Sequence, residues 1–414
     1  MTMIEEGQGK VAGAARRAGV AQGITVVIAG YLPILAIISM FPAVPAMIQH
    51  FSADPLAPVK VPSMVSAPGL TIAIVGFFVG MMVDRFGRRR LLLASTFLYG
   101  VLGALPFLLE SLDALYASRL ALGVVEAAIL TTLNTLIADY WDEDGRRNWL
   151  TVQGLAGPLL SAVIIYFAGS LVEWHWNAIF LLYLVAFPIF IAMWAWMFEP
   201  TRAAASRVTP RDAGPGDSVT DFPWMLMVGI GALTLFSSVL YYVYIINGGI
   251  VWQELGVKDA GEIGRVSALP SLLVLLGAGL FWVQGKLGFN TRIQLVTFLI
   301  ALGVGLLLIG RAQDAGDMIF ALGVQQTGTG MAIPVLIAWA QNRLPYAHRG
   351  RGMGVWAACF FFGQFSSPLI VGAIRSAMPT MQSVFSALGV AGVLAAAVVW
   401  IALSRESRRA SGPV

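Results

Sequence analysis

Arg119 and Glu126 are the two charged residues that the sequence places deep inside a long apolar run, which extends over residues 113–139. A charge within hydrocarbon costs at least about 2.5 kcal/mol on insertion scales, so such residues commonly face a polar cavity and take part in function. Their spacing is close to two helical turns and puts both on one face, about 10 Å apart along the axis. Burial favours the neutral carboxyl group and a nearby guanidinium favours the carboxylate, so Glu126 is the candidate for exchanging a proton near neutral pH. The alternative is a structural ion pair or a hydrogen bond between helices.

The elements that carry these residues are membrane-spanning helices. Hydrophobic residues make up 58% of the 414 residues, and continuous stretches of about 20 apolar residues are each long enough to cross about 30 Å of hydrocarbon. Because the stretches do not alternate between apolar and polar residues, they indicate helices rather than the strands of a barrel. The sequence predicts an all-α membrane protein with twelve transmembrane helices, at residues 20–48, 62–83, 91–110, 113–139, 149–172, 178–198, 223–247, 262–285, 293–311, 317–342, 352–376 and 381–404.

The basic residues are concentrated in alternate loops, whereas the other loops keep Lys60, Lys258 and a few arginines near helix ends. Positive charge collects on the cytoplasmic side, so we expect both termini in the cytoplasm of a multi-pass protein embedded in the lipid bilayer of a bacterial inner membrane. The first apolar run is full length, which argues against a cleavable signal peptide. The net charge of +4 follows from this topology and does not indicate a nucleic-acid partner.

Composition and an internal repeat divide the chain into two halves. Residues 199–222 are rich in Pro, Gly, Ser and charge, so they predict a cytoplasmic linker between six-helix halves at 1–198 and 223–404, with a cytoplasmic tail at 405–414. The segment from Leu120 to Glu126 is similar to the segment from Phe320 to Gln326. Gln326 does not titrate, so coupling through a carboxylate would be confined to the first half.

A short basic segment, Gly80–Arg90, lies between the second and third apolar runs. Its carboxylate, Asp84, is placed to accept hydrogen bonds from the amides of a helix N-terminus or from arginines of a neighbouring loop. Gly80 and Gly87 permit a close approach and a tight turn. The segment therefore predicts a contact at the cytoplasmic surface that breaks and re-forms.

The basic segment matches the pattern G-x-x-x-D-R-x-G-R-R at every fixed position, from Gly80 to Arg89. With it, the chain resembles the major facilitator superfamily over its whole length. A second signature of that family, R-x-x-x-G in the fourth helix, corresponds to Arg119 and Gly123. The resemblance implies a latch between the halves that favours the outward-facing state. It would be formed by Gly80, Asp84, Arg85, Gly87 and Arg88.

The fifth run contains G-x-x-G-P, which is typical of proton-coupled antiporters of this family. Its residues here are Gly154, Gly157 and Pro158, although Ser161 and Ala162 stand where paired glycines are usual. The resemblance implies a closely packed, bent helix that allows closure.

The fourth run also resembles that of spinster-type lipid transporters, which carry R-x-x-x-G-x-G-E-A. Here Arg119, Gly123, Glu126 and Ala127 match the pattern, and Val125 replaces its second glycine.

The family resemblance implies two pseudo-symmetric six-helix halves around a cavity lined by the first, fourth, seventh and tenth helices. The polar and aromatic residues expected there and on the adjoining gating helices are Tyr31, Asn134, Gln153, Tyr241, Tyr242, Tyr244, Asn247, Gln325, Gln326 and Gln364. Aromatic walls with few hydrogen-bonding groups suit a mid-sized amphipathic organic molecule better than a sugar or a bare ion.

The expected function is secondary active transport by alternating access, with protons and a small molecule as ligands, no cofactor or metal, and a monomer as the functional unit. Proton-coupled export is the leading interpretation, and Arg119 would orient the substrate or modulate Glu126. Uptake of a small organic anion and lysolipid transport of the spinster type are the alternatives. A membrane enzyme is disfavoured because no catalytic constellation is visible, and a channel because no filter sequence is.

Overall fold

The computed structural model describes residues 18–200, 222–345 and 348–410, apart from the side chains of Asp84 and of 406–410. In these ranges every regular element is a helix, and twelve helices are long and apolar enough to cross a membrane. The predicted all-α class and the twelve spans are confirmed.

The helices of the N-terminal half are α1 (Val20–Ala29), α2 (Leu32–Ile38), α3 (Ala43–His50), α4 (Ala57–Phe86), α5 (Arg88–Ala104), η1 (Leu105–Leu108), α6 (Leu112–Tyr140), α7 (Glu143–Trp174), η2 (Ala178–Val185) and α8 (Ala186–Trp196). Those of the C-terminal half are α10 (Trp224–Glu254), α11 (Ala260–Ser271), α12 (Val274–Lys286), α13 (Thr291–Ile309), α14 (Ala315–Arg343), α15 (Arg349–Arg375) and α16 (Met381–Ala410).

The first apolar run is broken, whereas the sequence predicted one helix over 20–48. α1 ends at Ala29, α2 at Ile38, and α3 follows. Prolines explain the breaks because they have no N–H to donate: Pro33 stands in the first turn of α2, and Pro42 directly precedes α3. Two buried tyrosines bond to carbonyls of this segment. Tyr99 Oη donates to Leu32 O at 2.5 Å, and Tyr183 Oη donates to Ala36 O at 2.9 Å.

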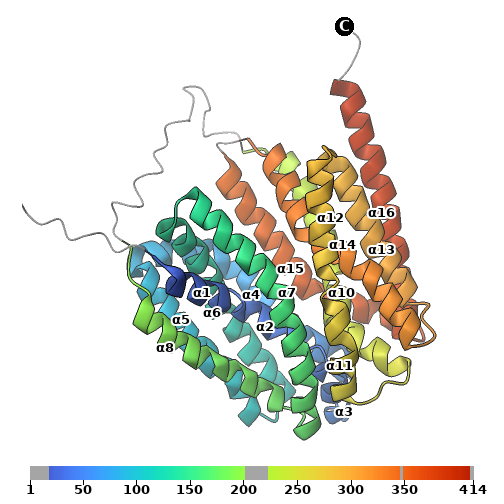
Figure 1. Ribbon diagram of the computed structural model, residues 1–414. Helices are drawn as coiled ribbons and strands as arrows, with labels where there is room; N and C mark the ends of the chain where they lie inside the picture. The colour runs from blue at the N-terminus through green and yellow to red at the C-terminus, as the bar shows by residue number, and fades with distance from the viewer. Residues whose placement is uncertain (1–17, 201–221, 346–347, 411–414) are drawn as a thin grey trace, which may run out of the picture.

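The two halves lie side by side, blue to green and yellow to red in Figure 1. We call the end with the α4–α5 and α14–α15 turns the basic end, and the end with the α3–α4 and α7–η2 turns the opposite end. Across the interface, α15 packs on α4 and α11 packs on α7. These two pairs make most of the contact between the halves.

Glycines let α7 and α11 touch at the opposite end. A Cβ on Gly169 would lie 2.4 Å from Ala260 O, and one on Gly264 would lie 2.7 Å from Ile165 O. Only a residue without a side chain permits this approach.

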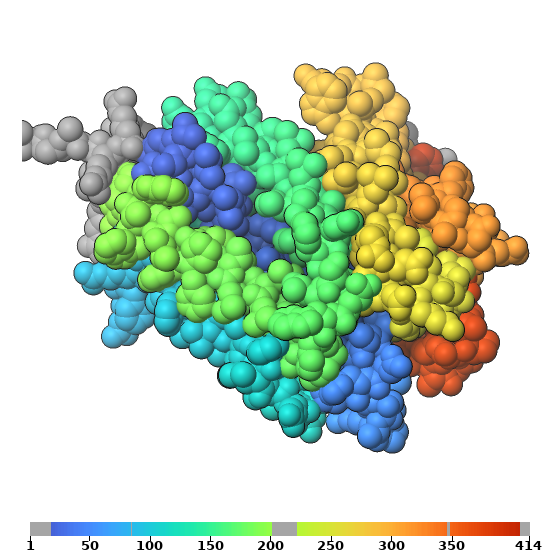
Figure 2. Space-filling model, turned by 60° about the horizontal axis from the view of Figure 1, so that its bottom comes forward, coloured from blue at the N-terminus to red at the C-terminus, as the bar shows by residue number. Residues whose placement is uncertain are grey.

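Toward the basic end the same helix pair separates. A Cβ on Gly154 or Gly157 would meet no atom within 4 Å. Figure 2 shows the green surface of α7 and the yellow surface of the eighth span apart above the point where they touch. The interface between the halves is therefore closed at the opposite end and open on this side toward the basic end.

Candidate functional site

A cavity of about 440 Å³ lies between the halves, where α7 and the eighth span diverge. It is enclosed by the first, fifth, seventh, eighth and tenth spans. Its wall consists of Tyr31, Ile34, Ile38, Phe41, Leu150, Gln153, Gly154, Gly157, Pro158, Ser161, Ile165, Tyr241, Tyr244, Ile245, Ser267, Ser271, Val274, Gln326 and Thr329. Because both halves contribute, a molecule in this central cavity would contact both.

The wall carries aromatic rings, aliphatic side chains, hydroxyls and amides, and none of its residues is charged. Some polar groups already bond to each other. The hydroxyls of Tyr31 and Ser161 form a hydrogen bond that joins the first span to α7, and Ser161 Oγ also donates to Gly157 O at 2.9 Å. The amide of Gln326 forms no hydrogen bond within the part of the chain that the structure describes. A cavity of this size and chemistry suits an organic molecule with a large apolar part and a few polar groups.

The structure brings half of the predicted cavity residues together. Tyr31, Gln153, Tyr241, Tyr244 and Gln326 line the central cavity. The three residues of the fifth-helix pattern, Gly154, Gly157 and Pro158, lie on the same wall.

The other predicted cavity residues lie elsewhere because of helical phase. On α10, Tyr241 and Tyr244 line the central cavity, whereas Tyr242 does not and is buried, with its ring centroid 4.9 Å from that of Tyr241. Asn247 is buried and donates to Val243 O at 3.2 Å.

Three more predicted residues are also outside the central cavity. Gln325 is fully buried and donates to Thr329 Oγ1 at 2.9 Å. Gln364 packs against Gly69, where α15 meets α4. Asn134 lines a separate cavity between α4, α6 and α15.

Sequence reasoning missed the hydroxyls of the wall. Ser161 lies one turn after Gly157, and Thr329 three residues after Gln326, so helical spacing from the predicted residues is a signal that finds both. Ser267 and Ser271 lie on the eighth span, which was not among the helices expected to line the cavity.

Arg119 is buried in the N-terminal half and does not lie on the wall of the central cavity; its exposed fraction is 1%. Its guanidinium carbon is 4.8 Å from the ring centroid of Phe180 and 4.7 Å from that of Tyr183. Nη1 donates to Tyr183 Oη at 2.5 Å, and the same hydroxyl donates to Ala36 O. The arginine is thus linked through one tyrosine to the broken first span.

Glu126 is also buried, with an exposed fraction of 2%. Among the described residues, no ion pair joins it to Arg119. Glu126 Oε1 and the Nε and Nη2 atoms of Arg119 are buried without a hydrogen-bond partner in the described part of the chain. Buried polar atoms are normally paired. The free oxygen of Glu126 could therefore bind a proton or a water molecule, and the free N–H groups of Arg119 could bind water.

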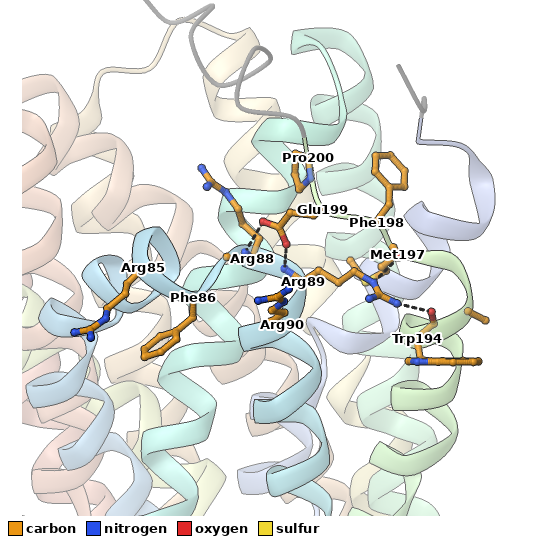
Figure 3. A pocket seen from close by; sticks show the side chains of 12 residues that line it. Arg85, Phe86, Arg88, Arg89, Arg90, Trp194, Met197, Phe198, Glu199 and Pro200 are labelled. Atoms are coloured by element: carbon orange, nitrogen blue, oxygen red, sulfur yellow. Dashed lines mark hydrogen bonds between the residues drawn. The ribbon is translucent and has the colours of Figure 1, made fainter. Parts of the chain in front are cut away.

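The basic segment at the α4–α5 turn bonds within the N-terminal half (Figure 3). Arg88 Nε forms an ion pair with Asp139 Oδ2 at 3.0 Å. The carboxylate of Glu199 accepts from the backbone N–H groups of Arg88 and Arg89, each at 2.8 Å. Arg89 donates to the carbonyls of Met197 and Trp194, both at 2.8 Å.

Of the predicted latch residues, Gly87 makes the expected tight turn with φ +85°. The expected close approach at Gly80 is absent, since a Cβ there would meet no atom within 4 Å. Arg85 is exposed at the end of α4, and the side chain of Asp84 lies outside the described residues.

No group of three or more His, Cys, Asp or Glu side chains in the described ranges is arranged to hold a metal ion.

The twelve spans in two halves, with a cavity between them, define a membrane transporter. The family model of the major facilitator superfamily matches residues 26–314, and the chain belongs to this superfamily.

Curated relatives and solved structures agree with this assignment. The chain is 27% identical to the multidrug efflux pump LfrA of Mycolicibacterium smegmatis over 59% of its own length and 51% of the relative's. It therefore spans about half the length of that relative. It is 24% identical to the class C tetracycline resistance protein of Escherichia coli, over 80% of this chain and 82% of that one. The inward-open xylose transporter XylE of E. coli superimposes with a TM-score of 0.72 at 15% identity, covering 91% of this chain and 95% of the other.

Proposed function

We propose that the protein exports a mid-sized amphipathic organic molecule by alternating access, in exchange for protons. The observation that carries this proposal is the uncharged, aromatic central cavity between the halves, closed at one end and open toward the other. The positive charge of the basic end supports its assignment to the cytoplasm. In the conformation described, substrate would then enter from the cytoplasm, and closure of α7 on the eighth span would accompany release on the other side.

In this proposal Glu126 exchanges the proton. It is a buried carboxyl group with an unpaired oxygen, and ionisable residues inside membrane spans commonly serve proton transfer. Arg119 modulates its charge from the same helix. Because neither residue lies on the wall of the central cavity, proton and substrate bind at separate places, and the first span connects them through Tyr183 and Tyr31.

The names of several relatives support export, since they include a multidrug efflux pump and a tetracycline resistance protein. Uptake of an organic acid is the second candidate, because the 3-(3-hydroxy-phenyl)propionate transporter of E. coli K12 is 25% identical over 81% of this chain and 82% of its own. Lysolipid transport has its support in the spinster homologue, with a TM-score of 0.72 at 13% identity, which is a likeness of fold alone. The absence of a cation on the described cavity wall favours a neutral amphipathic molecule over an anion.

Closure of the basic end would bring the α4–α5 turn toward the C-terminal half. The proposed latch then consists of Asp84, Arg85 and Arg88, and Arg88 would exchange its ion pair with Asp139 for a contact across the halves. The proposed functional unit is a monomer, because the cavity is complete within one chain.

The test is proton movement in proteoliposomes that contain a pH-sensitive dye. Amphipathic cations, organic anions and lysolipids are added separately to liposomes with the native protein or with Glu126→Gln. We expect one class to cause proton flux in the native protein and none above background in the variant.

The matched control is Glu110→Gln, which removes an exposed carboxylate from the α5–α6 turn and should leave the flux unchanged. A flux that survives in Glu126→Gln would contradict the assignment of this residue. A flux caused only by organic anions, of the sign of proton-anion uptake, would establish the second candidate in place of export.

A further inference from the structure

Two cavities outside the central one meet at the basic end of the N-terminal half. One, of about 680 Å³, lies between the α4–α5 turn and the end of α8 and is drawn in Figure 3. The other, of about 500 Å³, lies between α4, α5 and α6. Arg85, Phe86 and Arg90 line both. The two cavities therefore adjoin at these residues, and we call them together the depression, with a basic part and an apolar part.

The basic part has four arginines in its wall, and they fall into two pairs. Arg88 is bonded to Asp139, and Arg89 to two backbone carbonyls. Arg85 and Arg90 are exposed and form no hydrogen bond or ion pair within the described residues, although the guanidinium carbon of Arg85 lies 5.7 Å from the ring centroid of Phe86. These two arginines are also the two that line the apolar part.

The apolar part is a groove between helices. α4 and α5 both pack on α6 but little on each other, which leaves a channel with α6 as its floor. Its walls are Val75, Val79, Met82, Leu91, Ala94, Ser95, Leu98, Val124, Val125 and Ala128. Leu98 is 45% exposed and Val124 is 40% exposed, so the groove opens to the outside of the bundle, where the hydrocarbon of the bilayer lies.

The dimensions and charge of the depression correspond to a lipid. The interval from Arg90 to Leu98 spans about 12 Å of helix, and one leaflet of the hydrocarbon core is about 15 Å thick. The guanidinium groups lie at the cytoplasmic surface assigned above, where phosphate groups of lipids are found. Trp194 and Phe86 stand beside them, as aromatic residues do at membrane interfaces.

We infer that this depression binds one anionic phospholipid, whose headgroup lies in the part lined by Arg85 and Arg90 and whose acyl chain fills the groove between α4, α5 and α6. Two guanidinium groups favour an anionic headgroup over a zwitterionic one, because the latter brings its own positive charge. The site is separate from the central cavity, and the inference requires neither proton coupling nor a particular substrate. It rests on the proposed function only for the side on which the basic end lies.

The experiment measures lipid bound to the purified full-length protein by native mass spectrometry, with equal amounts of phosphatidylglycerol and phosphatidylcholine added. We expect the native protein to retain phosphatidylglycerol preferentially. Arg90→Gln should weaken this binding about fivefold, as expected for one basic residue at the surface. Leu98→Trp should also weaken it, because the indole fills the groove. Arg90 is used because it is not a latch residue.

The control is Arg147→Gln, which removes an exposed arginine at the same end that pairs with Asp144 at 2.9 Å; lipid retention should not change. If Leu98→Trp fails to fold, Val124→Trp on α6, the floor of the groove, repeats the test. Glycerol phosphate distinguishes a lipid from a free phosphate, and competition at concentrations equal to the lipid would overturn the inference. Equal retention of the two lipids, or native retention in Arg90→Gln, would overturn it as well.

Discussion

The fourth helix of each half, α6 in the first and α14 in the second, shows how differently two repeats of one fold are used. Both helices are 29 residues long, and Glu126 corresponds to Gln326 in the repeat. Glu126 is buried off the wall of the central cavity, with Arg119 on the same helix, whereas Gln326 lies on that wall. At the position of Arg119 the second half has Ile319.

The difference indicates a division of labour between the halves. The first half has no charged residue on the described wall of the central cavity, and its buried Arg119 is connected to the broken first span by Tyr183. The second half offers an amide and a hydroxyl to the cavity through Gln326 and Thr329. Under the proposed function, the first half senses protons, the interface holds substrate, and the first span links the two.

The largest effect is expected when the carboxylate is moved from one repeat to the other. The double variant Glu126→Gln with Gln326→Glu keeps one carboxylate but places it on the cavity wall, with Ile319 and not an arginine seven residues before it. We expect substrate-driven proton flux to remain at background, measured in dye-loaded proteoliposomes. Restored flux would contradict the assignment of proton exchange to the first half alone, since it would show that either repeat can carry the carboxylate.

A smaller effect is expected for the substrate. Gln326→Leu removes one hydrogen-bonding group from the cavity wall and should weaken substrate binding about fivefold, measured by titration of the purified protein. Asn134→Leu is the matched control, because that amide lines the separate cavity between α4, α6 and α15 and not the central one. Equal losses in both variants would show a structural effect and not a cavity contact.

Tyr183→Phe tests the connection within the first half. The change leaves Arg119 Nη1 without its acceptor and Ala36 O without the tyrosine donor. We expect a loss of about 1 kcal/mol of stability, seen as a melting temperature lower by a few degrees. Tyr166→Phe, at a 44% exposed tyrosine of α7, should melt like the native protein. An unchanged melting temperature for Tyr183→Phe would show that this link is dispensable for stability.

The smallest effect on stability is expected at the opposite end, where different polar contacts stabilise the turns of the two halves. The first half uses the ion pair of Lys60 with Asp54 at 2.9 Å, and the second uses Glu254, which accepts from Met381 N and Gln382 N at 2.6 and 2.9 Å. The hydrogen bond from Lys60 holds the pKa of Asp54 below its ordinary value of 3.8.

A lowered pKa stabilises the folded state above the unfolded-state pKa, and this contribution is lost as the pH falls through the folded-state value. Asp54→Asn should therefore melt slightly earlier than the native protein at pH 6 and equally at about pH 2. Thermal melting at both pH values checks this, and a difference that persists at the lower pH would contradict it.

The fold could be predicted from the sequence because membrane spans are recognised by the length of their continuous apolar runs. In addition, the residues from Gly80 to Arg89 match a specific family pattern. The breaks of the first span were missed, since Pro33 and Pro42 lie within an otherwise continuous apolar run. Prolines are tolerated inside other helices here, including Pro158 and Pro334, so proline alone does not predict a break.

The candidate site was predicted less completely, for geometric reasons. A list of polar residues on expected helices does not fix their rotation, which explains why Tyr241 lines the cavity and Tyr242 does not. The placement of Arg119 against Phe180 and Tyr183 depends on how the sixth span packs, and no local pattern encodes that contact. The groove between α4, α5 and α6 likewise depends on the spacing of three helices.

The separation of proton and substrate sites is tested most directly by comparing two transport modes of Glu126→Gln in the same proteoliposomes. One is exchange of labelled for unlabelled substrate without a proton gradient, and the other is substrate movement driven by a gradient. If the two sites are separate, we expect exchange to continue at near the native rate while gradient-driven movement is lost. Loss of both modes, or of neither, would contradict it.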